Sequence, residues 1–443
     1  MRKRREELRG KLTEFVLAAI DGSRELSDEE LRGLIEQSIR AHTPDLSLSV
    51  SERITGKRDV FHALRGLDVL QEMMDDPDIT EIMVNGPHDI FYEKDGELFR
   101  SEARFSGERK LSDVIQKIAA GVNRAVNEAN PIVDARLPDG SRVNVVLPPV
   151  SLVGPALTIR KFPKERITMQ RLVELGSISG EAAAQLEILV KAGYNIFVSG
   201  GTGSGKTTML NALSDFIPPD ERVVTIEDSA ELQLSGIPNL VRLEMRNANA
   251  EGNHAISIRD LIKTSLRMRP SRIVVGEVRD AASIDMLQSL NTGHNGMSTG
   301  HANSPADMLS RIETMTLLGE EIPLLAVRKQ IASAIEIIIQ LGRLRDKTRK
   351  VLEITEILDC TDGEIRLNPL FRFQEIGETS EGRILGELRP TGNLLQRRGK
   401  LLAAGLTLPE PRKAPREASG VLTRGVAEAA VREAPGALTR EVL

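Results

Sequence analysis

The stretch GGTGSGKTT, residues 200–208, constrains the fold more than any other part of the chain. It fits the pattern G-x-x-x-x-G-K-[ST] and lies between the apolar run NIFVSG and a helical pattern that begins at Met209. A loop of this kind joins a buried strand to a helix, and its glycines let backbone N–H groups turn inward around phosphate oxygens. The stretch therefore predicts an α/β domain with a phosphate-binding loop, here called the P-loop.

Apolar runs elsewhere in the same half of the chain favour the same fold class. Besides NIFVSG, this half contains RVVTIED and RIVVGEV, each followed by glycine or charged residues and then by a helical pattern. Strands of this composition are buried on both faces and belong to parallel sheets. A strand pair that turns at Asp362-Gly363 follows them. We therefore predict a P-loop domain with a parallel-rich sheet.

The rest of the chain divides by its pattern into four further units. The beginning reads as two polar helical segments, the second of which opens with a capping box formed by Ser27 and Glu30. Helical and strand patterns then alternate as in a small mixed α/β domain, and a polar linker follows. The end of the chain lacks aromatic residues, so we expect a disordered tail. The predicted units are residues 1–58 (helical appendage), 59–163 (small domain), 164–179 (linker), 180–373 (P-loop domain) and 374–443 (tail).

Charge and cysteine content exclude several functional classes. The formal net charge of -5 gives no electrostatic footprint for nucleic acid, so we expect no direct nucleic-acid partner. The single cysteine, Cys360, forms no internal disulfide and anchors no thiolate zinc site, which favours the reducing cytoplasm. No apolar run approaches the ~20 residues that cross a bilayer, so we expect no transmembrane segment.

The residues of the P-loop have distinct expected roles. Lys206 should reach the β- and γ-phosphates of a nucleotide, and Thr207 should place its hydroxyl on Mg²⁺. The expected cofactors are therefore ATP and Mg²⁺. The predicted phosphate cradle comprises Gly201, Thr202, Gly203, Ser204, Gly205, Lys206, Thr207 and Thr208.

Carboxylates follow two of the apolar runs. Glu277 lies near the end of RIVVGEV, and a glutamate at a strand end beside a P-loop is suited to polarise the attacking water, so we predict that it is catalytic. Glu227, Asp228 and Glu231 follow another strand in TIEDSAEL and supply enough carboxylate to hold metal-bound waters. We assign Glu227 a second catalytic role, and we place Mg²⁺ on Thr207, Glu227 and Asp228.

Motifs along residues 59–373 carry a resemblance to a known family. They are EIMVNGP, VDARLPDGSRVN, GPALTIRKF, GGTGSGKTT, TIEDSAELQL, IRDLIKTSLRMRPSRIVVGEVRDAASIDMLQSLNTGH and HANSPADMLSRIETM. With these motifs in family order, residues 59–373 resemble the secretion-superfamily ATPases, and among them the CpaF branch that powers assembly of tight-adherence (Flp) pili. The resemblance implies a RecA-like fold for the P-loop domain, a PAS-like fold for the small domain before it, and the family motifs named Walker A, Asp box, Walker B and His box.

The same resemblance suggests roles for histidines and arginines. His294 and His301 match the His box, which in this family lies beside the nucleotide; here the box is one residue shorter than the family pattern G-S-x-x-T-x-H. We place both histidines in the catalytic group. Two histidines seven residues apart supply too few ligands for zinc. Several arginines are implied to clamp the nucleotide, among them Arg136, Arg142 and Arg160 of the small domain, the last also placed in the catalytic group.

The resemblance implies a function as a motor. We expect a hexameric Mg²⁺-dependent ATPase that works at the cytoplasmic face of the inner membrane and drives pilus assembly or secretion through membrane platform proteins. A type IV secretion ATPase that exports DNA or protein shares every catalytic motif and is the main alternative. A small-molecule kinase would need an acceptor pocket and a lid, which nothing in the sequence indicates. A scaffold that binds nucleotide without hydrolysis is disfavoured because Lys206 and Glu277 are both present.

Overall fold

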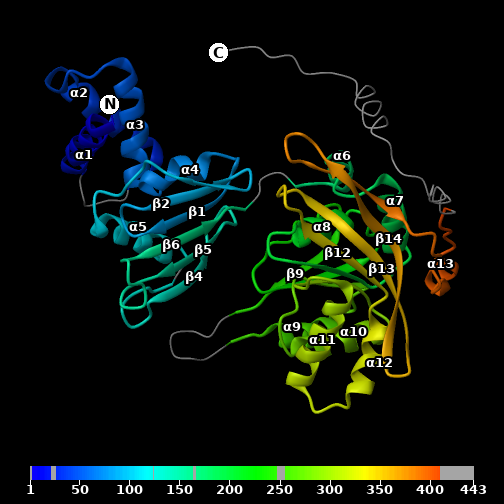
Figure 1. The fold of residues 1–443 in the computed structure, drawn as a ribbon. Helices are drawn as coiled ribbons and strands as arrows, with labels where there is room; N and C mark the ends of the chain where they lie inside the picture. Colours follow the sequence, from blue (N-terminus) through cyan, green and yellow to red (C-terminus); the bar gives the residue numbers. More distant parts are fainter. Residues whose placement is uncertain (1, 21–25, 123, 163–165, 247–254, 410–443) are drawn as a thin grey trace.

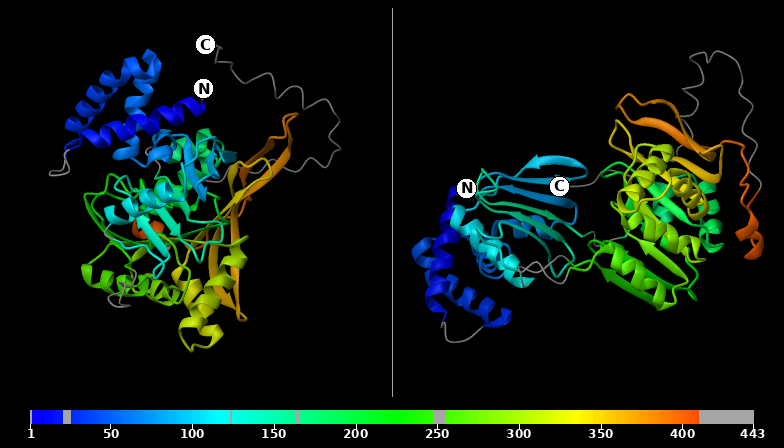
Figure 2. Two further views of the ribbon diagram at one scale, coloured as in Figure 1. Left: turned by 90° about the vertical axis from the view of Figure 1, so that its left-hand side faces the viewer. Right: turned by 90° about the horizontal axis from the view of Figure 1, so that it is seen from below.

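The computed structural model describes residues 2–20, 26–122, 124–162, 166–246 and 255–409. Three bodies follow one another along the chain: a helical bundle, a region built on a six-stranded sheet, and a larger region built on a nine-stranded sheet. The bundle lies on the side of the first sheet away from the second, and the two sheet regions lie side by side (Figures 1 and 2). None of the helices in the described part of the chain is both long and apolar enough to span a bilayer.

The helical bundle has a small core of its own. Leu12, Ile35 and Val60, one from each helix, are buried together. The predicted capping box is confirmed, because the Glu30 N–H donates to Ser27 Oγ (3.3 Å) and the Ser27 N–H donates to the Glu30 carboxylate (2.9 Å). The helices are α1 (Arg2–Ala19), α2 (Asp28–Leu46) and α3 (Val50–Leu64).

A six-stranded sheet, antiparallel throughout, forms the second body. Its strand order is β3-β2-β1-β6-β5-β4, and α5 packs its apolar side, which includes Leu111 and Ile115, into the core beneath the sheet. The segments ITEIMVN and IFYEK form β1 and β2, which pair with each other. The elements are η1 (Asp68–Leu70), α4 (Gln71–Asp75), β1 (Ile79–Asn85), β2 (Ile90–Lys94), β3 (Glu97–Arg100), α5 (Glu108–Gly121), β4 (Ile132–Arg136), β5 (Arg142–Val146) and β6 (Ala156–Arg160).

The predicted parallel sheet is present in the third body. Strands β9, β8, β10, β11, β7 and β12 are parallel neighbours, and β13, β14 and β15 continue the sheet in antiparallel order. One core joins the sheet to α6, α7 and α8, and a second core joins its other face to α9, α10, α11 and α12. The elements are α6 (Met169–Glu174), α7 (Gly180–Lys191), β7 (Ile196–Gly200), α8 (Lys206–Ser214), β8 (Arg222–Glu227), β9 (Asn239–Glu244), α9 (Ile258–Ser265), η2 (Leu266–Met268), β10 (Arg272–Val275), α10 (Ala282–Asn291), β11 (Asn295–Gly300), α11 (Pro305–Gly319), α12 (Leu324–Ala334), β12 (Ile337–Arg343), β13 (Arg349–Thr361), β14 (Glu364–Glu378), β15 (Ile384–Pro390) and α13 (Gly399–Ala403).

Our boundary for the tail at residue 374 is wrong. Strand β14 continues past Phe373, β15 pairs with it, and α13 follows. The buried carboxylate of Glu356 accepts the N–H groups of Gln396 (3.0 Å) and Arg397 (2.7 Å), which fixes the segment after β15. Strand pairing and the buried Glu356 carboxylate therefore hold the segment after Phe373 in place, although it contains no aromatic residue. Residues 410–443 of the predicted tail lie outside the described part of the chain.

Two other predicted boundaries also need correction. Helix α3 is continuous across the predicted boundary at 58/59, because Ser49 and Glu52 form a capping box that starts the helix at Val50, nine residues before residue 59. The predicted linker, residues 164–179, carries α6, whose Met169 and Leu172 are buried in the core of the third body. A six-residue helix with two buried apolar residues resembles a polar connector in sequence, which explains the second error.

Candidate functional site

Four chain segments meet at one edge of the nine-stranded sheet. Strands β7, β11, β10 and β8 are parallel, so their carboxyl ends lie at the same edge. The P-loop follows β7, His301 follows β11, Glu277 lies two residues past β10, and Asp228 follows β8. This topology brings together residues that are up to 101 positions apart, counting from Gly200 to His301.

The P-loop has the backbone geometry that its glycines allow. Gly203 and Gly205 adopt positive φ of +69° and +96°, and Gly205 is the N-cap of α8. The Met209 N–H donates to the Gly205 carbonyl (2.9 Å), so the hydrogen-bond ladder of α8 starts there. The earlier N–H groups have no intrahelical partner and favour an anion. All the predicted cradle residues lie on this loop and the first turn of α8, namely Gly201, Thr202, Gly203, Ser204, Gly205, Lys206, Thr207 and Thr208.

Lys206 is a buried cation at the centre of the loop. Lys206 as a whole is 8% exposed, and its amine donates to the carbonyls of Gly200 (3.2 Å) and Gly201 (3.0 Å). Among the described residues no carboxylate forms an ion pair with this amine. Burial lowers the pKa of Lys206, the charge of Glu277 opposes that shift, and Arg160 and Arg279 add to it. A buried ammonium without a paired anion, beside free N–H groups, fits a phosphate.

His301 connects Lys206 to Glu277. The Lys206 amine lies 3.3 Å from His301 Nδ1, and His301 Nε2 lies 3.2 Å from Glu277 Oε1. Because the ammonium only donates, Nδ1 accepts and Nε2 carries the proton toward the carboxylate. Burial and the charge of Lys206 lower the pKa of His301 against the opposing charge of Glu277, which favours this neutral form. The shortened His box therefore still brings His301 to the P-loop.

Arg279 is a site residue that our reading of the sequence missed. It holds Glu277 with two contacts, from Nε to Oε1 and from Nη2 to Oε2, both 2.8 Å. Burial raises the pKa of Glu277, but the hydrogen bond and charge of Arg279, with the charges of His301 and Lys206, outweigh it and lower the pKa overall. Its place two residues after Glu277, on the loop that leaves the same strand, was the available signal.

The carboxylates of the Asp box make different contacts. Glu227 is 2% exposed, and its Oε2 accepts the N–H groups of Glu231 (2.6 Å) and Leu232 (2.7 Å). Because Oε2 is engaged by the loop that follows β8 and Oε1 has no hydrogen-bond partner in the described part of the chain, the catalytic and metal roles of Glu227 stay predictions. Asp228 departs from our metal assignment, since one oxygen accepts from Arg142 (3.3 Å) and the other lies 3.4 Å from Arg279.

Glu231 places a carboxylate oxygen close to Thr207. Its Oε2 lies 3.5 Å from Thr207 Oγ1. Hydroxyl and carboxylate oxygens are the ligands that Mg²⁺ prefers, and this ion commonly keeps several waters. In the described part of the chain no three or more His, Cys, Asp or Glu side chains form a metal-binding group. Thr207 with Glu231 therefore fits an ion that is held mainly by water and phosphate.

Arginines of the six-stranded sheet reach the same edge. Arg142 of β5 contacts Ser229 Oγ (2.7 Å), Asp228 (3.3 Å) and Glu231 Oε1 (3.0 Å). Arg160 of β6 lies 3.9 Å from the same Glu231 oxygen. Arg136 lies farther along the contact, 3.7 Å from Glu244 at the end of β9. The structure thus brings Arg142 and Arg160 to the P-loop side and leaves Arg136 on the neighbouring edge strand.

His294 is not brought to the site. It precedes β11, whereas His301 follows it, so the two histidines lie at opposite ends of a six-residue strand. At ~3.3 Å per residue this separates them by about 20 Å. His294 Nδ1 instead contacts the Ser289 carbonyl (3.2 Å) at the end of α10. The structure therefore does not bring His294 to the P-loop, and its catalytic role stays a prediction.

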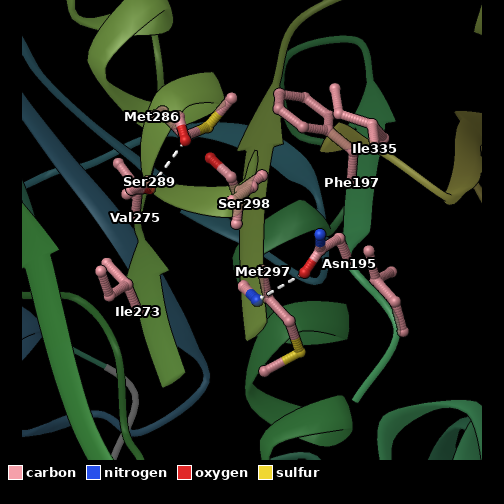
Figure 3. A pocket seen from close by; sticks show the side chains of 12 residues that line it. Asn195, Phe197, Ile273, Val275, Met286, Ser289, Met297, Ser298 and Ile335 are labelled. Atoms are coloured by element: carbon pink, nitrogen blue, oxygen red, sulfur yellow. Dashed lines mark hydrogen bonds between the residues drawn. The ribbon is translucent and has the colours of Figure 1, made fainter. Parts of the chain in front are cut away.

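A small cavity beneath α10 is not a second substrate pocket. Its volume is about 10 Å³, room for about one water, and it lies in the core between α10 and strands β7, β10 and β11. Figure 3 shows Asn195 and Ser298 among its lining side chains; the side-chain oxygen Oδ1 of Asn195 accepts the Gly296 N–H (2.9 Å). The polar lining serves the core, and the chemistry of the site lies at the P-loop.

Comparisons with known proteins identify the family. A family model described as type II/IV secretion system protein matches residues 64–378. A putative conjugal transfer protein of Mycobacterium tuberculosis is 35% identical over 326 residues, which are 72% of this chain and 92% of that protein. The type IV secretion system protein PtlH of Bordetella pertussis is 34% identical over 316 residues, 65% of this chain and 93% of that protein.

A solved structure is also similar in sequence. The VirB11 ATPase from the Brucella suis type IV secretion system is 27% identical, with a TM-score of 0.36, and the similarity covers 66% of this chain and 96% of that one. The family model spans most of the chain and includes every site residue named above. The resemblance stated from the motifs is confirmed at this level, and the chain belongs to the type II/IV secretion system protein family.

Proposed function

We propose that this chain is a Mg²⁺-dependent ATPase whose P-loop domain is RecA-like and whose six-stranded domain is PAS-like. The observation that carries the proposal is the convergence of Lys206, His301 and Glu277 at one edge of the parallel sheet. A phosphate in the loop replaces the two carbonyls that Lys206 now contacts, and free N–H groups of α8 add donors. ATP is the substrate that suits a cradle of this size and charge.

Each residue has a separate task in hydrolysis. Glu277 orients and polarises the attacking water, because its carboxylate lies past the strand end beside the P-loop. His301 holds that carboxylate in place through Nε2. Thr207, with Glu231 nearby, holds Mg²⁺, which when bound offsets phosphate charge. Arg142 and Arg160 supply cationic groups from the other domain, and either one suits the role of finger.

The work done by hydrolysis is proposed from the family. We propose a homo-hexameric motor that acts at the cytoplasmic face of the inner membrane on platform proteins and drives assembly of pili of the CpaF-dependent type. The names of two relatives, a conjugal transfer protein and a type IV secretion protein, favour the alternative that the motor exports DNA or protein. Adjacent prepilin and platform genes support the pilus motor, whereas channel and relaxase genes support export.

Glu277→Gln tests the reaction. The amide keeps the size of the side chain but lacks the charge that polarises water, so we expect nucleotide binding to persist while phosphate release falls to background. Glu313→Gln is a matched control: the Glu313 side chain is 14% exposed, against 16% for Glu277, and it is paired with Arg328 away from the P-loop. Hydrolysis by Glu277→Gln at the parental rate would falsify the assignment of the base.

Assembly is tested by light scattering at micromolar protein. With a non-hydrolysable ATP analogue and Mg²⁺ we expect a mass close to six chains, because a ring contact brings cationic groups of one chain against the nucleotide of the next. A monomer under these conditions rejects the hexamer but leaves the intrachain chemistry untouched. The two experiments therefore separate the reaction from the assembly.

A further inference from the structure

Arg279 restrains the residue that the proposed reaction uses as its base. Both oxygens of Glu277 contact the guanidinium at 2.8 Å, and this bidentate geometry is among the strongest that an arginine makes with a carboxylate. Glu277 Oε1 also contacts His301. A carboxylate held in this way keeps few lone pairs for a water, and its lowered pKa makes it a weaker base. The geometry is that of a restrained base.

A second acceptor for Arg279 lies within reach. Asp228 Oδ2 is 3.4 Å from Arg279 Nη1, so a small movement converts this longer contact into a direct hydrogen bond. The Arg279 side chain is 61% exposed, which leaves it free to make that movement. Nε and Nη2 of Arg279 contact Glu277, whereas Nη1 faces Asp228, so a bidentate contact with Asp228 requires Arg279 to release at least one oxygen of Glu277.

Arg142 determines how strongly the Asp228 carboxylate attracts Arg279. It contacts the other oxygen of Asp228 at 3.3 Å and so neutralises part of its charge. Arg142 also contacts Glu231, which lies 3.5 Å from Thr207 on the P-loop. Anionic phosphate beside Thr207 attracts Arg142 away from Asp228. The charge left on Asp228 then attracts Arg279.

We propose that Arg279 is a positioning residue that restrains Glu277 and moves to Asp228 when Arg142 is drawn to bound nucleotide. This exchange rests on the proposed ATPase function and regulates the same site. It links the position of the six-stranded domain, which carries Arg142, to the freedom of the base at the end of β10. The base then becomes fully available only after the two domains engage a phosphate.

Arg279→Gln in the full chain tests the restraint. We expect kcat for ATP to rise at least about threefold, with KM changed less than about twofold, because the substitution frees the base without touching the cradle. Adding Glu277→Gln should remove the whole increase. A kcat at or below the parental value, in a variant with parental melting temperature, overturns the proposal.

Arg345→Gln is the matched control for loss of an exposed arginine. Arg345 is 53% exposed and pairs with Glu375 and Glu378, away from the P-loop, so its loss should leave kcat unchanged. An increase of the same size in this variant also overturns the proposal. Where Arg279→Gln fails to fold, Arg279→Lys keeps the charge with poorer bidentate contact and should give a smaller increase; no increase overturns the restraint.

Asp228→Asn tests the exchange itself. The amide introduced at this position keeps one acceptor oxygen but loses the negative charge that attracts Arg279. Arg279 should therefore stay on Glu277, so kcat should fall, and combining Asp228→Asn with Arg279→Gln should restore kcat to the level of Arg279→Gln alone. A double variant as slow as Asp228→Asn overturns the exchange. Binding of a fluorescent ADP analogue and parental hydrolysis are measured in parallel: their absence refutes the proposed function, whereas their presence with unresponsive Arg279 variants refutes only this inference.

Discussion

Replacing His301 with alanine removes the imidazole that connects Lys206 to Glu277. The parent has contacts of 3.3 Å to the Lys206 amine and 3.2 Å to Glu277 Oε1, both involving charged groups. A hydrogen bond to a charged group contributes ~1.5–3 kcal/mol, and each ~1.4 kcal/mol is a factor of ten in rate. The His301 side chain is 31% exposed, so solvent replaces part of the interaction and the low end applies. We therefore expect turnover to fall about tenfold.

The accompanying measurements separate this role from two others. In the proposed mechanism His301 acts beside the γ-phosphate, which ADP lacks, so the affinity for a fluorescent ADP analogue should stay nearly unchanged. A packing role would lower the melting temperature, and a zinc role would show stoichiometric zinc in elemental analysis of the parent; we expect neither. His294→Ala is the control from the same box, and its turnover should equal that of the parent because His294 lies at the other end of β11. Parental turnover in His301→Ala would refute the reasoning.

Three other predictions concern stability and pH. The pKa of His301 is lowered below its ordinary value of 6.5, so below that pH the unfolded chain binds the proton more readily and is favoured. Calorimetry should show that the melting temperature falls more steeply below pH 6.5 in the parent than in His301→Gln. Arg272 is fully buried and holds Glu221 with contacts of 2.7 and 2.8 Å, so Arg272→Met should cost about 3–5 kcal/mol in a urea unfolding experiment, and a cost below ~1 kcal/mol would show the pair to be dispensable. Gly205→Ala places a Cβ at φ +96° and should destabilise by at least ~1 kcal/mol, whereas Gly201→Ala, with no atom within 4 Å of the new Cβ, should unfold like the parent.

The sequence determined the elements of the P-loop domain and much of its site. Buried strands such as Ile196–Gly200 are continuous apolar runs, and a glycine-rich loop before a helix has few other uses, so local pattern predicted the P-loop and Lys206. Glu277 was found by its place after such a strand. Resemblance to the family added His301, whose neighbouring residues alone carry no comparable signal.

Only the tertiary structure decided which polar residues meet and what each one does. Strand order places His301 beside Lys206 and leaves His294 at the far end of the same strand, a difference that their shared motif conceals. The Glu227 side chain points toward the loop that follows β8 and accepts a backbone N–H there, whereas the Arg279 side chain points toward Glu277 and donates to its carboxylate. The order of the segment after Phe373 likewise depends on pairing with β14 and on a buried acid from β13. Local periodicity reports which residues are buried, whereas the partner of a buried or charged group is set by chain segments far away in sequence.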